Sequence, residues 1–283
     1  MKRVIINADD FGLHSATNIG IVKGLEEGLI TSASIMACGK AFDDAVSLVK
    51  KHCIDAVGVH LVLDEEEPIL PPHQIPSLVT SDGCFLNRRT LLKRLYFSNR
   101  ISLIEVEIEF RAQIERCLEN GLSLSHLDSH GHVHVYPRIA RLVARLAREY
   151  GIQRVRIPLE RLTVVELSHF DVRKYINKCI VSMFSIMTRG YFKKYGIRYP
   201  AGFMGMLHGG KLNSKNLEYV FSRLPQSDVV EIMSHPGIAD ASLETEYQNW
   251  CYNWQAELDA MLSTSKEDAA RSRSLKLISY SEI

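Results

Sequence analysis

Short apolar runs rich in β-branched residues alternate with longer amphipathic segments along this chain, and this alternation is the feature that most constrains its fold. The runs at 3–7 and 56–63 are apolar enough to predict strands that are buried on both faces. Strands separated by helices favour a parallel sheet with helical crossovers. We therefore predict an α/β fold with parallel strands, either a barrel or an open doubly wound sheet.

The predicted elements follow from hydrophobic period and from turn residues. The predicted strands are 3–7, 31–36, 56–63, 124–128, 154–157, 228–233 and 274–278. The predicted helices are 15–28, 41–51, 89–96, 102–120, 137–150, most of 160–200, and 244–262. Ser15 is the expected cap of the first helix and Gly28 its stop, while 64–87 is a proline-rich loop. Without a repeat or a linker, one domain over 1–283 is the simplest interpretation.

Composition excludes several classes of protein. The 34 Lys and Arg nearly balance the 33 Asp and Glu, so the charge gives no general attraction to nucleic acid. The six cysteines form no C-x-x-C pair, which argues against a thiolate zinc site and for reduced thiols. No signal peptide or membrane-spanning run is recognisable. We expect a cytoplasmic protein.

Polar clusters stand where predicted strands end. Asp9 and Asp10 follow the first strand, His60 lies in the third, a histidine-rich segment at 126–134 surrounds the end of the fourth, and His235 follows a late strand. In parallel α/β folds, ligands bind at the carboxyl ends of strands. These side chains are therefore expected to meet at one rim.

Adjacent carboxylates repel each other when both are ionised, so Asp9 and Asp10 indicate a bound cation nearby. The alternative is that they lie in a turn or cap a helix and have no functional role. Because successive strand side chains point in opposite directions, one could ligate a metal while the other moves protons. His60, inside an apolar strand, would alone be read as a core histidine. Its apolar surroundings also favour the neutral imidazole that binds metals.

The segment 126–134 carries four of the eleven histidines. Imidazole suits zinc, nickel and iron, whereas carboxylate and water also suit magnesium and manganese. One ion cannot take all of these ligands, so His132, His134 and Asp128 are candidates to contact substrate or to orient the ligands. A solvated histidine-rich turn is the simpler alternative.

Two further residues are candidates for catalysis. His235, before a Pro-Gly turn, could be the general acid that an amide leaving group needs, or a surface-loop histidine. Arg156 is a lone charge in an apolar run. It could hold substrate, orient a base or form a structural ion pair.

Together these motifs resemble the YdjC-like family of carbohydrate deacetylases, in the family's order and over residues 3–237. The matching pieces are Asn7–Gly12, Thr31–Ser32, Gly58–Leu63, His126–His130 with His132 and His134, and Ser234–Gly237. The segment 68–87 looks most like the hopanoid-biosynthesis-associated branch. The chitin-oligosaccharide branch has histidine where this chain has Gly131.

The resemblance implies a distorted (β/α) barrel that hydrolyses the N-acetyl group of an acetylated amino sugar. It implies a divalent ion on Asp10, His60 and His130, with Asp9 as the base, and a homodimer. Magnesium is our first choice of ion, with zinc, manganese, cobalt and nickel as alternatives.

Two rival functions stay open at this point, a metal-dependent phosphoesterase on a similar barrel and a non-catalytic sugar- or lipid-binding protein. The segment 173–198 contains seven Lys and Arg and no Asp or Glu, interleaved with apolar residues. It predicts either an amphipathic helix packed on the barrel or a peripheral contact with the inner membrane face. Trp250, Tyr252 and Trp254 could stack on sugar or pack in the core.

Overall fold

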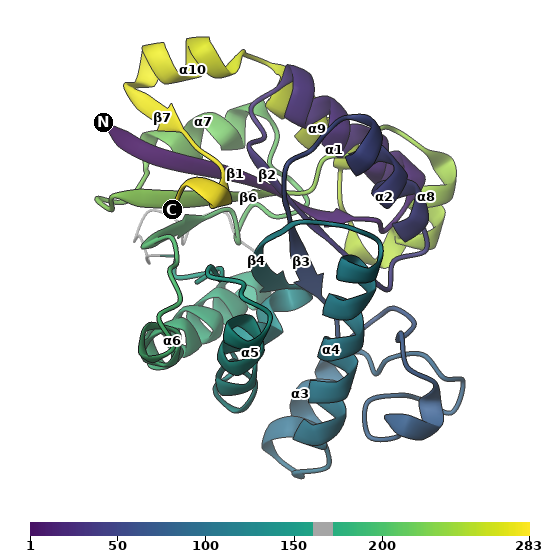
Figure 1. The fold of residues 1–283 in the computed structure, drawn as a ribbon. Coiled ribbons are helices and arrows are strands. Elements are labelled where there is room, and N and C mark those ends of the chain that lie inside the picture. The colour runs from purple at the N-terminus through teal and green to yellow at the C-terminus, as the bar shows by residue number, and fades with distance from the viewer. Residues whose placement is uncertain (161–171) are drawn as a thin grey trace.

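The computed structural model describes residues 1–160 and 172–283, and its centre is a seven-stranded, wholly parallel sheet (Figure 1). The strands are β1 (Lys2–Phe11), β2 (Ser32–Ile35), β3 (Val57–Leu61), β4 (Leu124–Ser129), β5 (Gly202–Met204), β6 (Val229–Ser234) and β7 (Leu275–Leu277). Their order is β4-β3-β2-β1-β6-β5, and β7 pairs with the beginning of β1. The strands form a half-barrel, which confirms the predicted α/β fold with parallel strands.

Ten α-helices are described. They are α1 (Ser15–Glu27), α2 (Phe42–Lys51), α3 (Arg88–Tyr96), α4 (Leu103–Glu119), α5 (Pro137–Glu149), α6 (Val172–Lys194), α7 (Ser214–Ser222), α8 (Ala241–Glu246), α9 (Trp254–Leu262) and α10 (Lys266–Arg273). Short 3-10 helices are η1 (Pro72–Gln74), η2 (His130–Val135), η4 (Gln248–Trp250) and η5 (Tyr280–Glu282). The helices surround the strands, with α1, α2 and α9 on one side and α4, α5 and α6 on another (Figure 1).

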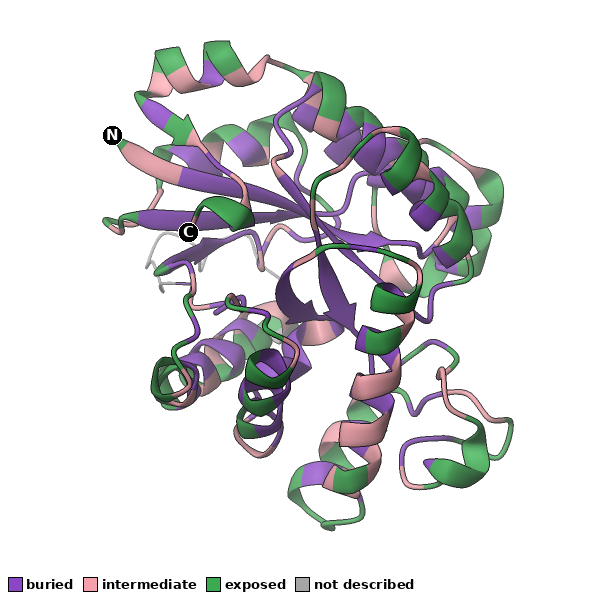
Figure 2. Cartoon of the chain, viewed as in Figure 1, coloured by how far each residue is buried: buried purple, intermediate pink, exposed green. Residues whose placement is uncertain are grey.

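The core lies between the strands and the inward faces of the helices (Figure 2). All residues of β3 and β6 are buried, which explains their continuous apolar runs. Helix α5 shows the complementary pattern: it begins at a proline and buries Ile139, Val143 and Leu146. Burying one such side chain contributes about 1.5–3 kcal/mol.

Helix 244–262 was predicted as continuous, and this was wrong. The segment is divided into α8, η4 and α9, with Cys251 in the left-handed region at φ 54°. A left-handed residue interrupts the ladder of helical hydrogen bonds. The Asn253 side chain then caps α9, and its backbone N–H donates to the Gly210 carbonyl. The break directs Trp250 and Tyr252 away from the helix surface and into a cavity.

Other differences are smaller. The predicted strand 154–157 is reduced to isolated parallel bridges, Leu127 with Val155 and Arg154 with Arg198, just before a proline that cannot donate to a ladder. Helix α1 is capped by His14 and not by Ser15. Strand β5 and helices α7 and α10 were not predicted. Of the helical region predicted at 160–200, residues 161–171 lie outside the described residues.

Candidate functional site

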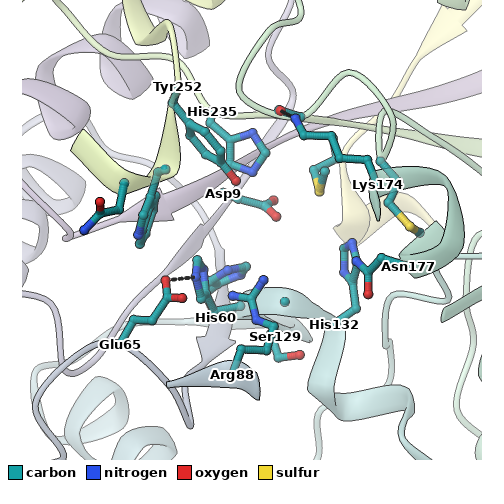
Figure 3. Close-up of a pocket in the computed structure, with 17 residues that line it drawn as sticks. Asp9, His60, Glu65, Arg88, Ser129, His132, Lys174, Asn177, His235 and Tyr252 are labelled. Carbon is teal, nitrogen blue, oxygen red and sulfur yellow. Dashed lines mark hydrogen bonds and ion pairs between the residues drawn. The ribbon is translucent and has the colours of Figure 1, made fainter. Parts of the chain in front are cut away.

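The carboxyl ends of β1, β3, β4 and β6 meet at one rim, as predicted, and they surround a cavity of about 290 Å³ (Figure 3). Strand register explains the meeting: His60 pairs with Asp128, and Ala8 with Ser234, in adjacent parallel strands. The cavity is lined by Asp9, His60, Glu65, Arg88, Ser129, His130, Gly131, His132, Lys174, Asn177, Met206, Gly209, Met233, His235, Asn249, Trp250 and Tyr252.

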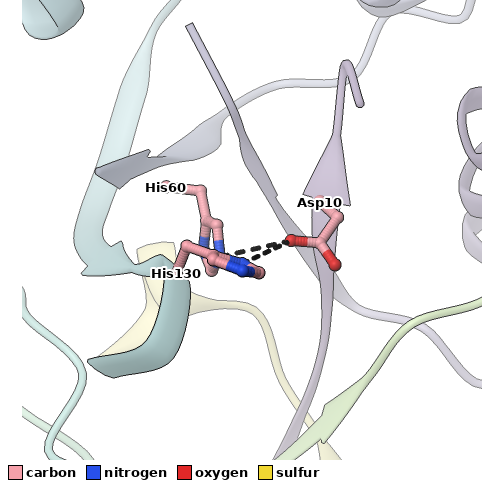
Figure 4. Close-up of side chains that lie close together, drawn as sticks. All are labelled: Asp10, His60 and His130. Carbon is pink, nitrogen blue, oxygen red and sulfur yellow. Dashed lines mark ion pairs between the residues drawn. The ribbon is translucent and has the colours of Figure 1, made fainter. Parts of the chain in front are cut away.

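Asp10, His60 and His130 form a compact group at the bottom of this rim (Figure 4). His60 Nε2 and His130 Nδ1 each lie 3.4 Å from Asp10 Oδ1. One ligand atom of each residue lies within 4.8 Å of the others. Two imidazoles and a carboxylate around one point are a ligand set that divalent metals use in hydrolytic sites.

The hydrogen bonding of Asp10 supports a cation at this point. Both of its carboxylate oxygens are buried, and neither has a hydrogen-bond partner among the described residues. An ionised carboxylate that accepts no hydrogen bond is costly inside a protein, and of the described groups only the two imidazoles at 3.4 Å face this one at close range. Burial alone would raise the pKa of Asp10, but His130, His235 and His60 hold it well below its usual range. Positive charge is therefore already favoured where an ion would lie.

A second group that could hold an ion, Asp9 with His60 and Asp128, is less suited to one. Asp9 Oδ1 accepts hydrogen bonds from Asn7 and Arg156, and Oδ2 accepts a second one from Arg156. Asp128 faces the same guanidinium at 2.9 Å. These carboxylates are already neutralised, which leaves Asp10 as the carboxylate in need of a cation.

The orientation of His60 is fixed from behind. Its Nδ1 lies 2.9 Å from Asp128 Oδ1 and 3.3 Å from the Ser34 hydroxyl, so that Nε2 faces Asp10. A carboxylate behind a ligating imidazole sets its tautomer and makes it a better donor. Asp128 is fully buried and is not among the residues that line the cavity, so it supports His60 from the side opposite Asp10.

His130 is held between two carboxylates. Its Nδ1 faces Asp10, its Nε2 lies 3.7 Å from Glu65 Oε2, and its ring stacks on Trp250 with centroids 4.8 Å apart. Burial alone would lower the pKa of His130, but Asp10 and Glu65 raise it to about 10. A metal on Nδ1 would displace this proton.

Backbone geometry turns the two neighbouring aspartates apart. Asp10 has φ 65°, in the left-handed region that Asp tolerates better than most residues, and the β1–β2 register shifts between Ala8 and Phe11. Such strain is typical of functional sites. As a result Asp9 lines the open cavity beside His235, while Asp10 faces the two histidines (Figures 3 and 4).

Arg156 holds Asp9 in place. Its Nη1 and Nη2 donate to the two Asp9 oxygens, each at 2.6 Å, and Glu231 Oε1 lies 2.7 Å from Nη2. Burial alone would lower the pKa of Arg156, but Asp128, Asp9 and Glu231 hold it well above its usual value. The side chain is fully buried, so it orients the carboxylates and does not reach the cavity.

His235 lines the cavity and is supported by Glu257. The Glu257 carboxylate accepts the His235 backbone N–H at 2.6 Å, and His235 Nδ1 lies 3.7 Å from the same oxygen. Burial alone would lower the pKa of His235, but Glu257 raises it. A histidine that holds its proton beside the cavity can act as an acid.

The remaining two candidate histidines, His132 and His134, lie in different surroundings. His132 lines the cavity, whereas His134 is fully buried and lies between the Ser129 hydroxyl, at 2.6 Å, and the Arg156 carbonyl, at 2.9 Å. Burial lowers the pKa of His134 to about 3. His134 is therefore placed where it braces the rim, out of reach of a ligand in the cavity.

The three aromatic residues predicted to stack on sugar or pack in the core differ in their location. Trp250 and Tyr252 line the cavity, and the Tyr252 ring lies 4.9 Å from that of His235, whereas Trp254 is buried in the core. Sequence reasoning missed several lining residues, chief among them Glu65, Arg88, Lys174 and Asn177. Two signals were available: the long proline-rich loop at 64–87, because long loops in compact domains are often functional, and the basic amphipathic segment 173–198, which contains Lys174 and Asn177.

Gly131 matters because Arg88 occupies the space beside it. A Cβ at this glycine would lie 2.5 Å from Arg88 Nε, and its φ is 57°. Arg88 is in turn held by Asp64, 2.6 Å from Nε. The absence of a side chain at 131 therefore lets a guanidinium line the cavity.

Helix α6 has an unusual outer face. Its large exposed apolar residues are Val172, Ile176, Ile180, Met183, Ile186 and Met187. Lys174 and Asn177 of the same helix line the cavity. Within the described ranges, no helix combines the length and the apolar character that crossing a membrane requires.

The chain is similar to known proteins along almost all of its length. A carbohydrate deacetylase of Brevibacillus brevis is 30% identical over 283 residues, covering 99% of each chain. One of Oceanobacillus iheyensis is 31% identical, covering 92% of this chain and 96% of the relative. A crystal structure of an Enterococcus faecalis V583 protein, provisionally assigned to cellobiose-phosphate cleavage, superposes with a TM-score of 0.75 at 27% identity, covering 99% of this chain and 98% of that one. The family model described as YdjC-like protein matches residues 3–271, so the chain belongs to the YdjC-like family.

Proposed function

We propose that this chain is a metal-dependent carbohydrate deacetylase that removes the N-acetyl group of an acetylated amino sugar. Carbohydrate deacetylase is the name of its full-length relatives. The observation that carries the proposal is the orphaned Asp10 carboxylate, 3.4 Å from each of two imidazoles, beside a cavity that Asp9 and His235 also line.

Asp10, His60 and His130 would hold the ion. When bound, a divalent ion polarises a carbonyl and lowers the pKa of water. Asp9, with its direction fixed by Arg156, takes a proton from the attacking water. His235 donates a proton to the departing sugar amine. Glu257 holds the His235 ring in position for this transfer.

The ligand atoms of Asp10, His60 and His130 bear on which ion would bind. Two imidazoles and one carboxylate suit zinc, nickel, cobalt and iron better than magnesium, which prefers oxygen ligands. Magnesium was our first choice from the family resemblance. Because of this ligand set, we now regard zinc, nickel, cobalt and iron as equal candidates. Activity of chelated protein reloaded with each ion in turn decides between them.

The substrate we propose contains N-acetylglucosamine, as a glycan or a glycolipid, with a hopanoid glycolipid as one candidate. The exposed apolar face of α6 supports a lipid-linked substrate, because this helix also contributes Lys174 and Asn177 to the cavity. Co-sedimentation of the protein with anionic vesicles tests whether this face of α6 contacts a membrane. Met183→Asp should abolish binding to the vesicles, whereas Gly190→Ala should not. Equal sedimentation of the two variants would count against membrane contact.

The central test measures acetate released from N-acetylglucosamine-containing glycans and glycolipids. Metal-loaded protein should release acetate, and His130→Ala should not. The matched control is His73→Ala, which removes an exposed histidine outside the cavity. Phosphate release from sugar phosphates without acetate release would favour the phosphoesterase instead. A homodimer stays a prediction, which light scattering tests.

A further inference from the structure

A second cavity, of about 460 Å³, opens beside the first. The two cavities share Glu65, Asn249 and Trp250 in their linings. Trp250 thus lies in the wall of both cavities, and its ring also stacks on His130. A ligand with its acetyl group near His130 can continue past this ring into the second cavity.

Carboxylates dominate the second cavity. Glu65, Glu66, Glu67 and Glu246 line it, against a single ammonium, that of Lys40, which forms an ion pair with Glu246. The side chain of Lys40 is 60% exposed, so solvent screens its charge. Glu65 also faces His130, so Glu66 and Glu67 are the carboxylates that have no cation of their own among the lining residues. Burial raises the pKa of Glu66 to about 7, and a cationic group in the cavity would favour its ionised form.

An independent observation comes from Tyr247, in the wall of this cavity. The residue is only 6% exposed, and its hydroxyl is buried without a hydrogen-bond partner among the described residues, although Glu66 lies near it. Leaving a buried hydroxyl without a hydrogen-bond partner is unfavourable. A polar ligand in the cavity would supply that partner.

We propose that the second cavity binds the sugar next to the N-acetylated one and prefers a sugar with a free amine. The carboxylates would face its ammonium group, and Tyr247 and Asn249 would face its hydroxyls. Trp250 provides the apolar surface that separates the two sugars. The enzyme would then act on partly deacetylated chains. This inference rests on the deacetylase function proposed above.

The test uses two disaccharides with the same N-acetylglucosamine and linkage, in which the second sugar is glucosamine or glucose. With the metal-loaded enzyme, KM for the glucosamine compound should be about fivefold lower, as expected for a partly exposed charge pair, and kcat should be similar. Glu66→Gln and Glu246→Gln should each reduce this preference. Tyr247→Phe should raise KM for both compounds.

Glu27→Gln is the matched control, because it removes an exposed carboxylate of α1 outside both cavities. Equal KM values for the two disaccharides would overturn the inference, as would a preference that survives in both glutamine variants. If neither compound releases acetate, the proposed function fails instead.

Calorimetric titration with glucosamine and glucose then tests the second cavity alone. Tighter binding of glucosamine than of glucose, lost in Glu66→Gln, supports the inference, and equal binding of the two sugars overturns it. A second divalent ion lost in Glu66→Gln would identify a metal site and also overturn it.

Discussion

The guanidinium of Arg156 contacts both carboxylate oxygens of Asp9, each at 2.6 Å, from a position 147 residues later in the chain. A bidentate pair of this kind fixes direction as well as charge. It separates the two adjacent aspartates, because Asp9 is already paired while Asp10 has no hydrogen-bond partner among the described residues. One carboxylate can therefore move protons and the other can hold a metal.

Asp9→Asn should lower kcat by at least about 100-fold, because an amide cannot accept the water proton. The bound metal should be unchanged, since Asp10, His60 and His130 are intact. Acetate release and metal content of the same preparation provide the measurement. An Asp9→Asn enzyme with near-normal turnover would rule out Asp9 as the base.

Arg156→Met should destabilise the fold by about 3–5 kcal/mol, because Asp9, Asp128 and Glu231 are buried carboxylates that would lose the guanidinium they share. Urea unfolding at pH 7 measures this free energy. Arg148→Met, at an exposed position of α5, should change it by less than about 0.5 kcal/mol. Equal effects of the two substitutions would contradict the structural role of Arg156.

Asp128→Asn should weaken metal binding by about 10–100-fold, because Asp128 orients His60, one of the three ligands we propose, from behind. Competition with a chelator of known affinity measures the change. The control Asp82→Asn alters an exposed loop carboxylate and should leave the affinity unchanged. Normal metal affinity in Asp128→Asn would show that His60 needs no such support.

Stability should fall in mild acid partly through His126. Burial lowers the pKa of His126 to about 3, below its value of 6.5 in an unfolded chain, so the unfolded state binds the extra proton between these limits. The stability is fully present above pH 6.5 and declines as pH falls toward 3, by about 2 kcal/mol between pH 6.5 and 4.5. His126→Gln should flatten the pH dependence of urea unfolding, and His73→Gln at an exposed site serves for comparison. An unchanged slope would show that His126 is not a source of acid sensitivity.

Gly131→Ala should raise KM, because a Cβ there would lie 2.5 Å from Arg88 Nε and displace its guanidinium from the cavity wall. The positive φ adds a penalty of about 1–2 kcal/mol to stability. Gly190→Ala, in α6 with open space around it, should instead stabilise the protein by up to about 1 kcal/mol. Acetate-release kinetics and thermal unfolding of both variants check this, and matching kinetics would mean that Arg88 does not contact substrate.

Much of the fold could be predicted from the sequence because its signals are local. The apolar runs of β1, β3 and β6 depend on neighbours in the chain, and parallel strands bring their carboxyl ends to one edge. The aspartates and histidines at those ends therefore meet. The break at Cys251 was not predictable in this way, because the segment has helical periodicity, while the hydrogen bond from the Asn253 N–H to the Gly210 carbonyl joins positions far apart in the chain.

Local patterns in the chain are enough to indicate which residues gather at the rim, because they mark where the strands end. The contacts that each of these residues makes depend on how remote segments pack. Asp9 is paired because Arg156 arrives from a distant segment, His134 is buried while His132 faces the cavity, and Arg88 enters the space that Gly131 leaves. Partner choice depends on contacts between remote segments, which periodicity and spacing do not encode.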